Sequence, residues 1–213
     1  MKVGTDGVLL GAWTNCADAK SILDVGTGSG LIALMLAQRS EAQITAIDID
    51  ENACLQAQIN FEASSFRDHL SVQSIALQTF PFSQKYDLIV SNPPYFVNSL
   101  QSPNVRRTKA RHTGTLPFAD LIRKSTQLLN PFGRLSLILP FNAWEEIHHL
   151  AQENKLFLTR KTLVSPLKNS PPKRLLLEFS KKQKPTEEAA FYLEEGQGKR
   201  SKAYKTLTEE YYL

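Results

Sequence analysis

The amino-acid sequence predicts an α/β fold: a mostly parallel, seven-stranded sheet with one antiparallel strand near an edge and helices on both faces. Short apolar runs alternate with helix-forming segments along most of the chain, a pattern typical of parallel strands joined by helices. The last two runs, 156–164 and 174–179, follow one another without a helix between them, so we expect one to be antiparallel. The chain of 213 residues is long enough for one substantial core.

The composition is that of an ordinary globular protein with a mildly basic charge. The formal net charge of +4 permits a polyanionic partner but does not require one. Cys16 and Cys54 are too few for a disulfide framework or a zinc cluster, so we expect reduced thiols, a cytoplasmic protein and no metal site. No apolar run reaches the ~18 residues of a membrane span, and no obligate protein partner is evident.

The first predicted strand (21–25), a glycine loop and the first predicted helix (31–37) form a nucleotide-binding unit. The loop is Gly-Thr-Gly-Ser-Gly, in which the glycines let the backbone pass close to a ligand and the next helix presents free N–H groups. Its G-x-G-x-G spacing is tighter than the dinucleotide fingerprint, and Asp24 would repel phosphate and attract a cation. Both features favour S-adenosylmethionine, whose amino and sulfonium groups are positive; a glycine turn without a ligand is the alternative. The expected cofactor contacts of this unit are Asp24, Gly26, Thr27, Gly28 and Gly30.

The second predicted strand (43–48) ends at a further cofactor contact. Asp48 lies about 20 residues beyond the loop, where a carboxylate can accept hydrogen bonds from ribose hydroxyls. Ile49 is expected to cover a purine face, and Asp50 and Glu51 to be first-turn acids of a helix over 52–60. The alternative for Asp48 is a surface acid.

A weak third strand is predicted at 70–76, and a fourth at 86–90 ends in Ser-Asn-Pro-Pro-Tyr. The two prolines fix φ and remove two backbone donors, which leaves carbonyl oxygens free to face a ligand. Asn92 adds a side-chain carbonyl and Tyr95 an aromatic face, a combination that suits a planar group with an exocyclic NH2. We therefore predict Asn92, Pro93 and Tyr95 as catalytic residues, with Asn92 also beside the cofactor. The alternative is a proline turn that only ends the strand.

The remaining elements follow from apolar periodicity. A helix is predicted over 118–129, ending near Asn130-Pro131, followed by a strand at 133–139 and a helix at 143–152. Two closing strands are joined by a proline-rich basic connection, 165–173.

The segment 98–117 is the most basic stretch of the chain, and it is long for a loop within a compact domain. Because it follows the predicted catalytic turn, we expect it to grip nucleic-acid phosphates; a solvated run of charges is the alternative. The predicted nucleic-acid contacts, including those of the basic connection, are Arg106, Arg107, Lys109, Arg111, His112, Lys168, Lys173 and Arg174.

The two ends leave alternatives open. Residues 2–13 are predicted as a short glycine-bearing lead-in, in which Thr5 and Asp6 either cap a helix or contact the ligand. Basic residues are interleaved with Tyr204, Tyr211 and Tyr212 near the C-terminus. These tyrosines either stack on RNA or dock an amphipathic helix on the core.

The glycine loop, Asp48 and Asn-Pro-Pro-Tyr together resemble the class I, Rossmann-like S-adenosylmethionine methyltransferases that act on amino nitrogens. The stretches 1–13, 110–112, 172–179 and 203–213 are similar to one bacterial family within them, the tRNA1(Val) adenine-37 N6-methyltransferases. This resemblance implies S-adenosylmethionine as cofactor, with Thr5 and Asp6 beside it, and an anticodon-loop adenine of tRNA as substrate. It also implies a methyltransferase domain over 1–180 and a tail over 181–213 that docks on the core or contacts tRNA.

Two departures from that family affect these expectations. Members usually carry an aromatic and basic segment before Met-Lys-Val-Gly-Thr-Asp, with which this sequence starts, so part of a cofactor lid or tRNA surface is expected to be missing. An acid usually ends the third strand and holds the cofactor's adenine amino group, whereas this chain has Ala76. We therefore expect weaker cofactor binding or a compensating group.

The expected reaction is methyl transfer to N6 of adenine. Hydrogen bonds from N6 to the Asn92 side chain and the Pro93 carbonyl would localise its lone pair, and Tyr95 would stack on the base. The same turn would also serve glutamine methylation in release factors or DNA adenine methylation. A non-catalytic RNA-binding module is the alternative from another class, and a dinucleotide oxidoreductase is disfavoured.

Overall fold

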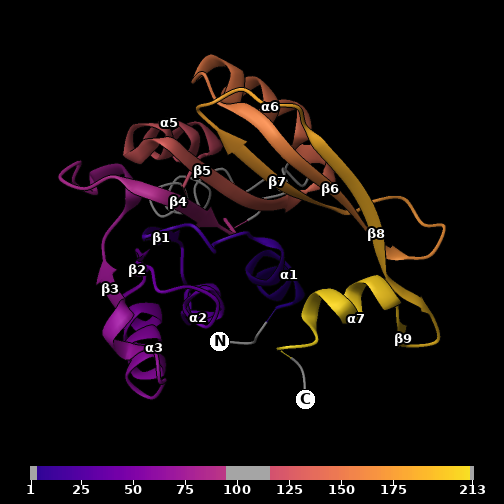
Figure 1. Ribbon diagram of the computed structural model, residues 1–213, viewed down its shortest axis with the longest axis horizontal. Coiled ribbons are helices and arrows are strands. Elements are labelled where there is room, and N and C mark those ends of the chain that lie inside the picture. Colours follow the sequence, from indigo (N-terminus) through magenta and orange to yellow (C-terminus); the bar gives the residue numbers. More distant parts are fainter. Residues whose placement is uncertain (1–3, 95–115, 212–213) are drawn as a thin grey trace, which may run out of the picture.

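Helices cover both faces of one mixed β-sheet (Figure 1). The computed structural model describes residues 4–94 and 116–211. The strands are β1 (Ser21–Val25), β2 (Gln43–Asp48), β3 (Leu70–Ser74), β4 (Tyr86–Ser91), β5 (Leu129–Pro140), β6 (Phe157–Leu167), β7 (Arg174–Ser180), β8 (Glu187–Gly196) and β9 (Lys199–Arg200). The α-helices are α1 (Thr5–Trp13), α2 (Leu31–Ala37), α3 (Glu51–Glu62), α5 (Phe118–Leu128), α6 (Trp144–Glu153) and α7 (Lys202–Thr208).

The sheet order is β3-β2-β1-β4-β5-β7-β6-β8-β9. β7 is antiparallel to both of its neighbours and β9 is antiparallel to β8, while the other neighbouring pairs are parallel. All seven predicted strands are present, and the α/β fold with a mostly parallel sheet is confirmed. The predicted count of seven is wrong, because the described residues form nine strands. β7 also lies inside the sheet rather than near an edge.

The two additional strands, β8 and β9, lie in the region predicted as a tail. β8 is flanked by pairs of glutamates, and its residues are exposed or half-buried, so it has no buried apolar run to mark it. It nevertheless pairs in parallel with β6 over most of its length. A strand near a sheet edge is stabilised by backbone pairing on one side and can remain polar, which is why apolar periodicity missed it.

The predicted lead-in is also wrong, because residues 5–13 form helix α1. Gly7 and Gly11 are both buried in this helix. A Cβ at Gly11 would lie 2.6 Å from the Met35 sulfur on α2, so a side chain there would displace the end of the Met35 side chain between the two helices. The N-cap is Gly4 and no side chain caps the helix, so Thr5 and Asp6 do not cap it.

Alternating residues of the strands face two separate hydrophobic clusters. Ile22 on β1 packs with residues of α1, α2, α3 and α7 on one face of the sheet. Its neighbour Leu23 packs with residues of α5 and α6 on the other face. Successive side chains of a strand point to opposite faces, so apolar residues are expected on both faces of β1 when helices cover both faces of the sheet. Tyr204 of α7 is buried in the first cluster, and Tyr211 packs against Val8, Ala12 and Met35.

The strand order reverses between β1 and β4, which places a crevice at the carboxyl ends of these strands. β1 pairs with β2 on one side and with β4 on the other, and Val25 is the register partner of both Ile47 and Ser91. The Ser91 hydroxyl donates a hydrogen bond to the Val25 carbonyl at 2.8 Å and ties the two strand ends together. In open α/β sheets, ligands bind at such a reversal. Within the described part of the chain, no helix is both long and apolar enough to cross a membrane.

Candidate functional site

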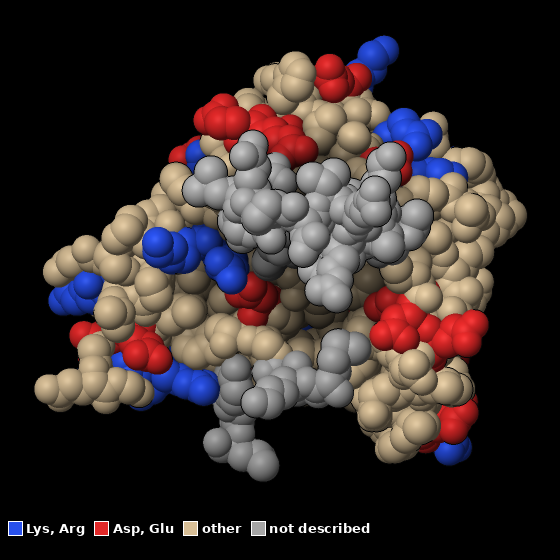
Figure 2. Space-filling model, turned by 180° about the vertical axis from the view of Figure 1, so that it is seen from behind, with Lys and Arg blue, Asp and Glu red and all other residues tan. Residues whose placement is uncertain are grey.

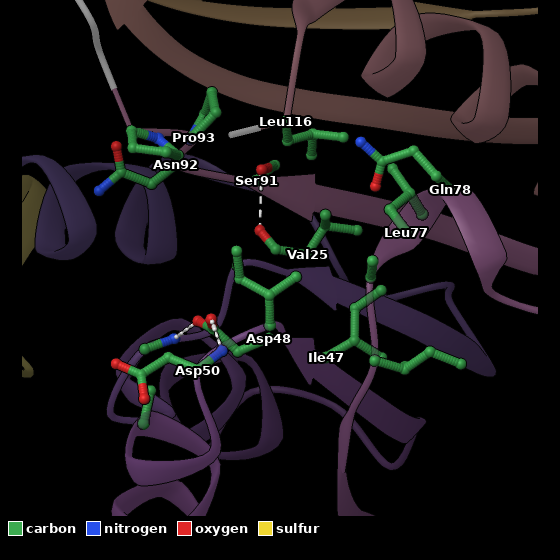
Figure 3. A pocket seen from close by; sticks show the side chains of 17 residues that line it. Val25, Ile47, Asp48, Asp50, Leu77, Gln78, Ser91, Asn92, Pro93 and Leu116 are labelled. Atoms are coloured by element: carbon green, nitrogen blue, oxygen red, sulfur yellow. Dashed lines mark hydrogen bonds between the residues drawn. The ribbon is translucent and has the colours of Figure 1, made fainter. Parts of the chain in front are cut away.

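A cavity of about 610 Å³ lies at the carboxyl ends of β1, β2 and β4 (Figure 3). Its wall is formed by the glycine loop, the residues after β2, the Asn-Pro-Pro turn after β4 and the residues that follow β3. Of the predicted site residues, Gly26, Gly28, Asp48, Ile49, Asn92 and Pro93 line it. Together with Leu116, the described lining therefore comes from five separate parts of the sequence at one edge of the sheet.

The glycine loop is shaped by three residues with positive φ. Gly26, Gly28 and Gly30 have φ of +72°, +58° and +81°, which side-chain-bearing residues rarely adopt. A Cβ at Gly26 would meet no atom within 4 Å, and because Gly26 lines the cavity, it would occupy space that a ligand could use. A Cβ at Gly30 would instead collide with the ring of Phe61 on α3. Gly26 thus faces the cavity, while Gly30 allows α3 to pack closely on the loop.

Asp48 is held on the cavity wall by backbone amides. Its Oδ2 accepts a hydrogen bond from the Gly28 amide at 2.9 Å, and its Oδ1 accepts one from the Asp50 amide at 3.0 Å (Figure 3). A carboxylate oxygen has two lone pairs, so both oxygens can still accept bonds from ligand hydroxyls. Ile49, beside it, is 53% exposed and lines the cavity with an apolar surface. Asp50 caps α3 by accepting from the Asn52 amide at 2.9 Å, so it is an N-cap rather than a first-turn acid.

Asp24, Thr27 and Gly30 lie behind the cavity wall rather than on it. Asp24 is fully buried, and its Oδ2 accepts a hydrogen bond from the Thr27 hydroxyl at 2.6 Å. Its Oδ1 has no hydrogen-bond partner. Burial raises the pKa of Asp24 to about 7; hydrogen bonding by the Thr27 side chain and by the Ala33 backbone opposes this shift, and the negative charge of Asp48 adds to it. A buried carboxylate with an unpaired oxygen favours a positive group nearby.

The Asn-Pro-Pro turn forms part of the wall of two cavities. A second cavity, of about 450 Å³, is lined by Asn92 and both prolines together with Gly4, Thr5, Asp6 and Arg174. Asn92 is half-buried and Pro93 is buried. Groups bound in the two cavities would therefore meet at the same turn.

Thr5 and Asp6 line the second cavity and not the larger one. The Asp6 carboxylate accepts a hydrogen bond from the Nε of Arg174 at 2.8 Å, which joins the start of α1 to the start of β7. Arg174, predicted as a nucleic-acid contact, thus lines a cavity together with the Asn-Pro-Pro turn.

The other predicted contacts with nucleic acid are only partly described. Lys168 and Lys173 are exposed on the connection between β6 and β7, at the same edge of the sheet as the turn. Tyr95 and the loop residues Arg106, Arg107, Lys109, Arg111 and His112 lie outside the described residues. On the face seen in Figure 2, both basic and acidic side chains of the described residues are present without either sign prevailing.

Two residues at this edge of the sheet were missed by sequence reasoning. Phe141 begins the 3-10 turn η4 (Phe141–Ala143), is 45% exposed, and donates its backbone N–H to the Lys173 carbonyl at 3.1 Å. Gln78, in the turn η2 (Leu77–Thr79), lines the large cavity. An exposed phenylalanine directly after an apolar strand was the available signal for Phe141. Nothing local distinguishes Gln78 from a surface glutamine. Among the described residues there is no group of three or more side chains that could hold a metal ion.

A family model described as "Methyltransferase small domain" matches residues 4–150. Among curated proteins, the chain is 54% identical over 182 residues to a tRNA1(Val) (adenine(37)-N6)-methyltransferase of Parabacteroides distasonis, covering 84% of this chain and 77% of the relative. It is 42% identical to proteins of the same name from Tolumonas auensis and Trichodesmium erythraeum, covering all of this chain and 90% and 91% of those relatives.

Solved structures show the same fold at low sequence identity. A predicted O-methyltransferase from Agrobacterium tumefaciens superposes with a TM-score of 0.72 at 20% identity, over 96% of both chains. The N-methyltransferase NodS from Bradyrhizobium japonicum, in complex with S-adenosylhomocysteine, superposes with a TM-score of 0.60 at 19% identity, over 84% of this chain and 85% of NodS. These likenesses confirm the expected fold.

Proposed function

The chain belongs to the tRNA1(Val) (adenine(37)-N6)-methyltransferase family, and we propose that it transfers the methyl group of S-adenosylmethionine to N6 of adenosine 37 in the anticodon loop of tRNA1(Val). The observation that best supports the proposal is the position of the turn Asn92–Pro94 in the walls of two cavities. A transferase needs its donor and acceptor to meet in one orientation, and a rigid turn between two sites supplies this.

The residues of the large cavity fit S-adenosylmethionine. Gly26 leaves open space that a side chain would fill, and Gly28 exposes backbone to the same space. Asp48 has acceptors for the two ribose hydroxyls, and Ile49 offers an apolar surface to a ring. The buried carboxylate of Asp24 behind the loop favours the positive charge of the amino acid part. When bound, S-adenosylmethionine supplies an electrophilic methyl group on a sulfonium.

The exocyclic amine of adenine is a poor nucleophile, so the protein must orient and activate it toward the methyl group. The N6 lone pair of adenine is delocalised into the ring. The Asn92 side-chain oxygen and the Pro93 carbonyl would accept hydrogen bonds from the two N–H groups and favour a nitrogen with a localised lone pair. Tyr95 would stack on the base and fix its angle of approach. The methylated nitrogen then loses one proton, and no covalent intermediate with the enzyme is required.

The second cavity suits the acceptor base. Its volume exceeds that of a single base, and its wall contains Arg174, a cation that can approach a phosphate beside a base turned out of the loop. Lys168, Lys173 and the exposed ring of Phe141 extend from Arg174 along the same edge. Bases of an anticodon loop are unpaired and can stack on such a ring. The described residues would thus form one side of a binding groove for the loop.

This substrate also accounts for the cellular setting that we propose. Aminoacylation and decoding of tRNA take place in the cytoplasm, and the two thiols of the chain, Cys16 and Cys54, are free and buried, as expected in a reducing compartment. The function requires no protein partner.

The proposal is tested with purified protein, labelled S-adenosylmethionine and total tRNA from a strain that lacks the endogenous activity. We expect label in N6-methyladenosine at position 37 of tRNA1(Val) after nucleoside analysis, and its loss after ribonuclease treatment. In parallel incubations with a release factor or with DNA in place of tRNA, label would instead support one of the two rival substrates. Failure to bind S-adenosylmethionine in a calorimeter would support a non-catalytic RNA-binding module.

A further inference from the structure

We propose that Gln78 recognises the adenine of the cofactor, in the place where this chain lacks an acid at Ala76. The inference rests on the proposed function, because it assumes that S-adenosylmethionine occupies the large cavity. It concerns the base of the cofactor and is independent of the base that is methylated.

The end of the cavity beyond Asp48 is an apolar slot. Ile49, Ile75, Leu77 and Leu116 line it, and the Ile75 amide donates to the Asp48 carbonyl at 2.9 Å, which keeps the slot adjacent to the proposed ribose contact. Apolar walls beside a ribose site suit a flat heterocycle, whose faces are apolar and whose edge is polar. The base of the nucleoside is therefore expected here.

Gln78 supplies a polar group at this end of the cavity. Figure 3 shows its side chain on the same side as Leu77 and Leu116, with Asn92 on the opposite side. Of the other polar side chains described on the wall, Asp48 is assigned to the ribose, Asp50 caps α3 through the Asn52 amide, and Ser91 donates to the Val25 carbonyl. Gln78 is the remaining candidate on the far side from Asn92.

The side-chain amide of Gln78 is oriented by one hydrogen bond but retains hydrogen-bonding capacity for a ligand. Its Nε2 donates to Oδ2 of Asp120 on α5 at 3.5 Å, a long bond, and Asp120 is already paired with Arg123 at 2.7 Å. This contact directs the nitrogen toward α5, and within the described chain the amide oxygen has no hydrogen-bond partner. One N–H of the NH2 group also remains for another acceptor.

A glutamine amide matches the edge of adenine. Its oxygen can accept from the exocyclic amine, and its second N–H can donate to an adjacent ring nitrogen, the same pairing by which Asn and Gln recognise adenine in nucleic acids. A neutral amide is also less costly to bury in an apolar slot than a carboxylate. The chain would then use one side-chain amide for each adenine: Gln78 for the cofactor and Asn92 for the substrate.

The test compares two ligands in a titration calorimeter: S-adenosylhomocysteine and S-inosylhomocysteine, in which a carbonyl replaces the amine. The unmodified protein should bind the adenine form about 10- to 100-fold more tightly, the range expected for one paired amide edge. In Gln78→Leu the affinity for the adenine form should fall about 10-fold or more, and the ratio between the two ligands should approach one. Gln78→Glu keeps the acceptor and should retain a preference for the amine.

Gln73→Leu is the matched control, because Gln73 is exposed on β3 and does not line the cavity. It should leave both affinities unchanged. If Gln78→Leu lowers both affinities equally and the ratio persists, Gln78 only supports the packing of η2 on α5, and the inference is wrong while the proposed function stands. If the unmodified protein binds both ligands with equal affinity, this result alone shows that the inference is wrong. If it binds neither, the cofactor assignment fails as well.

Discussion

Asp6 and Arg174 lie 168 residues apart in the sequence, and they form an ion pair with a Nε–Oδ2 distance of 2.8 Å beside the Asn-Pro-Pro turn. Their side chains are 24% and 35% exposed, so solvent screens the pair. It fixes the N-terminal helix relative to β7 at the wall of the second cavity. Because both residues were predicted as ligand contacts, the pair allows a structural role to be separated from a binding role.

We expect Asp6→Ala and Arg174→Ala each to lower the free energy of unfolding by no more than about 1 kcal/mol, since a partly exposed ion pair contributes little. The two variants should differ in tRNA binding. If Arg174 contacts a phosphate, Arg174→Ala reduces the slope of log K against log salt by about one, whereas Asp6→Ala does not. Filter binding at several salt concentrations measures the slope. Equal slopes for both variants would leave Arg174 with only the structural role.

Asn92→Ala should abolish methyl transfer while leaving the binding of S-adenosylhomocysteine nearly unchanged. Loss of a single preorganised hydrogen-bonding group at a reacting atom typically costs 10²- to 10³-fold in kcat, roughly the loss expected here. Single-turnover methylation of tRNA and calorimetry measure the two effects. Asn154→Ala, which removes an amide bound to the Leu150 carbonyl after α6, is the control and should retain activity. Turnover of Asn92→Ala equal to that of the unmodified protein would rule out the assigned role.

The two glycines at the ends of the loop should respond differently to alanine. Gly30→Ala should reduce the free energy of unfolding by about 3 kcal/mol or more, because strained backbone adds to a collision with the buried ring of Phe61. Gly26→Ala meets no protein atom and should cost only about 1 kcal/mol for the unfavourable φ. Its methyl group projects into the cavity, so it should weaken cofactor binding at least 10-fold. Urea unfolding and calorimetry give the comparison, and equal stability of the two variants would contradict it.

The buried carboxyl of Asp24 should make stability depend on pH. Burial raises its pKa from 3.8 to about 7, so the folded state holds a proton that the unfolded state has released between these values. Stability contributed by this group is therefore present below about pH 4 and is lost as pH rises to about 7, by up to about 4 kcal/mol. Asp24→Asn should remove this part of the slope when unfolding free energies are compared from pH 5 to 8.

Positive charge in the cavity should oppose this loss, because it favours the ionised carboxylate. S-adenosylhomocysteine, which carries an ammonium group, should thus raise the melting temperature more at pH 8 than at pH 5.5. An increase in melting temperature that does not depend on pH would show that the Asp24 carboxyl does not interact with the charge of the ligand.

Phe141→Ala should raise KM for tRNA about 10-fold with little change in kcat, because stacking of one base on an aromatic ring contributes about 1–3 kcal/mol. Phe141→Trp should restore the low KM. Phe132 offers a matched control: it is 75% exposed near the start of β5, whereas Phe141 directly follows the end of that strand, and Phe132→Ala should leave KM unchanged. An unchanged KM in Phe141→Ala would remove this ring from the proposed RNA surface.

Sequence reasoning succeeded where a local pattern and burial coincide. β1 and β4 each contain a short run of buried apolar residues because both faces of the sheet are covered, and the glycine loop and the proline turn stand directly at their ends. Such signals require no knowledge of the tertiary structure. They therefore located the cavity and the residues that follow the parallel strands.

The errors have a common cause, which is that the deciding contacts are distant in sequence. Glycine in α1 is explained only by Met35 of α2, and β8 only by its pairing with β6. Asp24 belonged to the right motif, but its depth behind the loop depends on how α2 and the sheet pack. Gln78 became a candidate only after η2 was seen to reach the cavity.

The packing of α7 on α1 has a consequence for biosynthesis. α1 lies at the start of the chain beside the second cavity, and part of its cover comes from Tyr204, Leu207 and Tyr211, which leave the ribosome after the whole catalytic core. A nascent chain can assemble its central strands as they emerge, but part of the apolar side of α1 stays uncovered until residues 204–211 have been synthesised. Ribosome stalling or premature termination near residue 200 would thus yield a protein in which the cofactor cavity has formed. The second cavity, proposed for the acceptor base, would lack the support that α7 gives to α1.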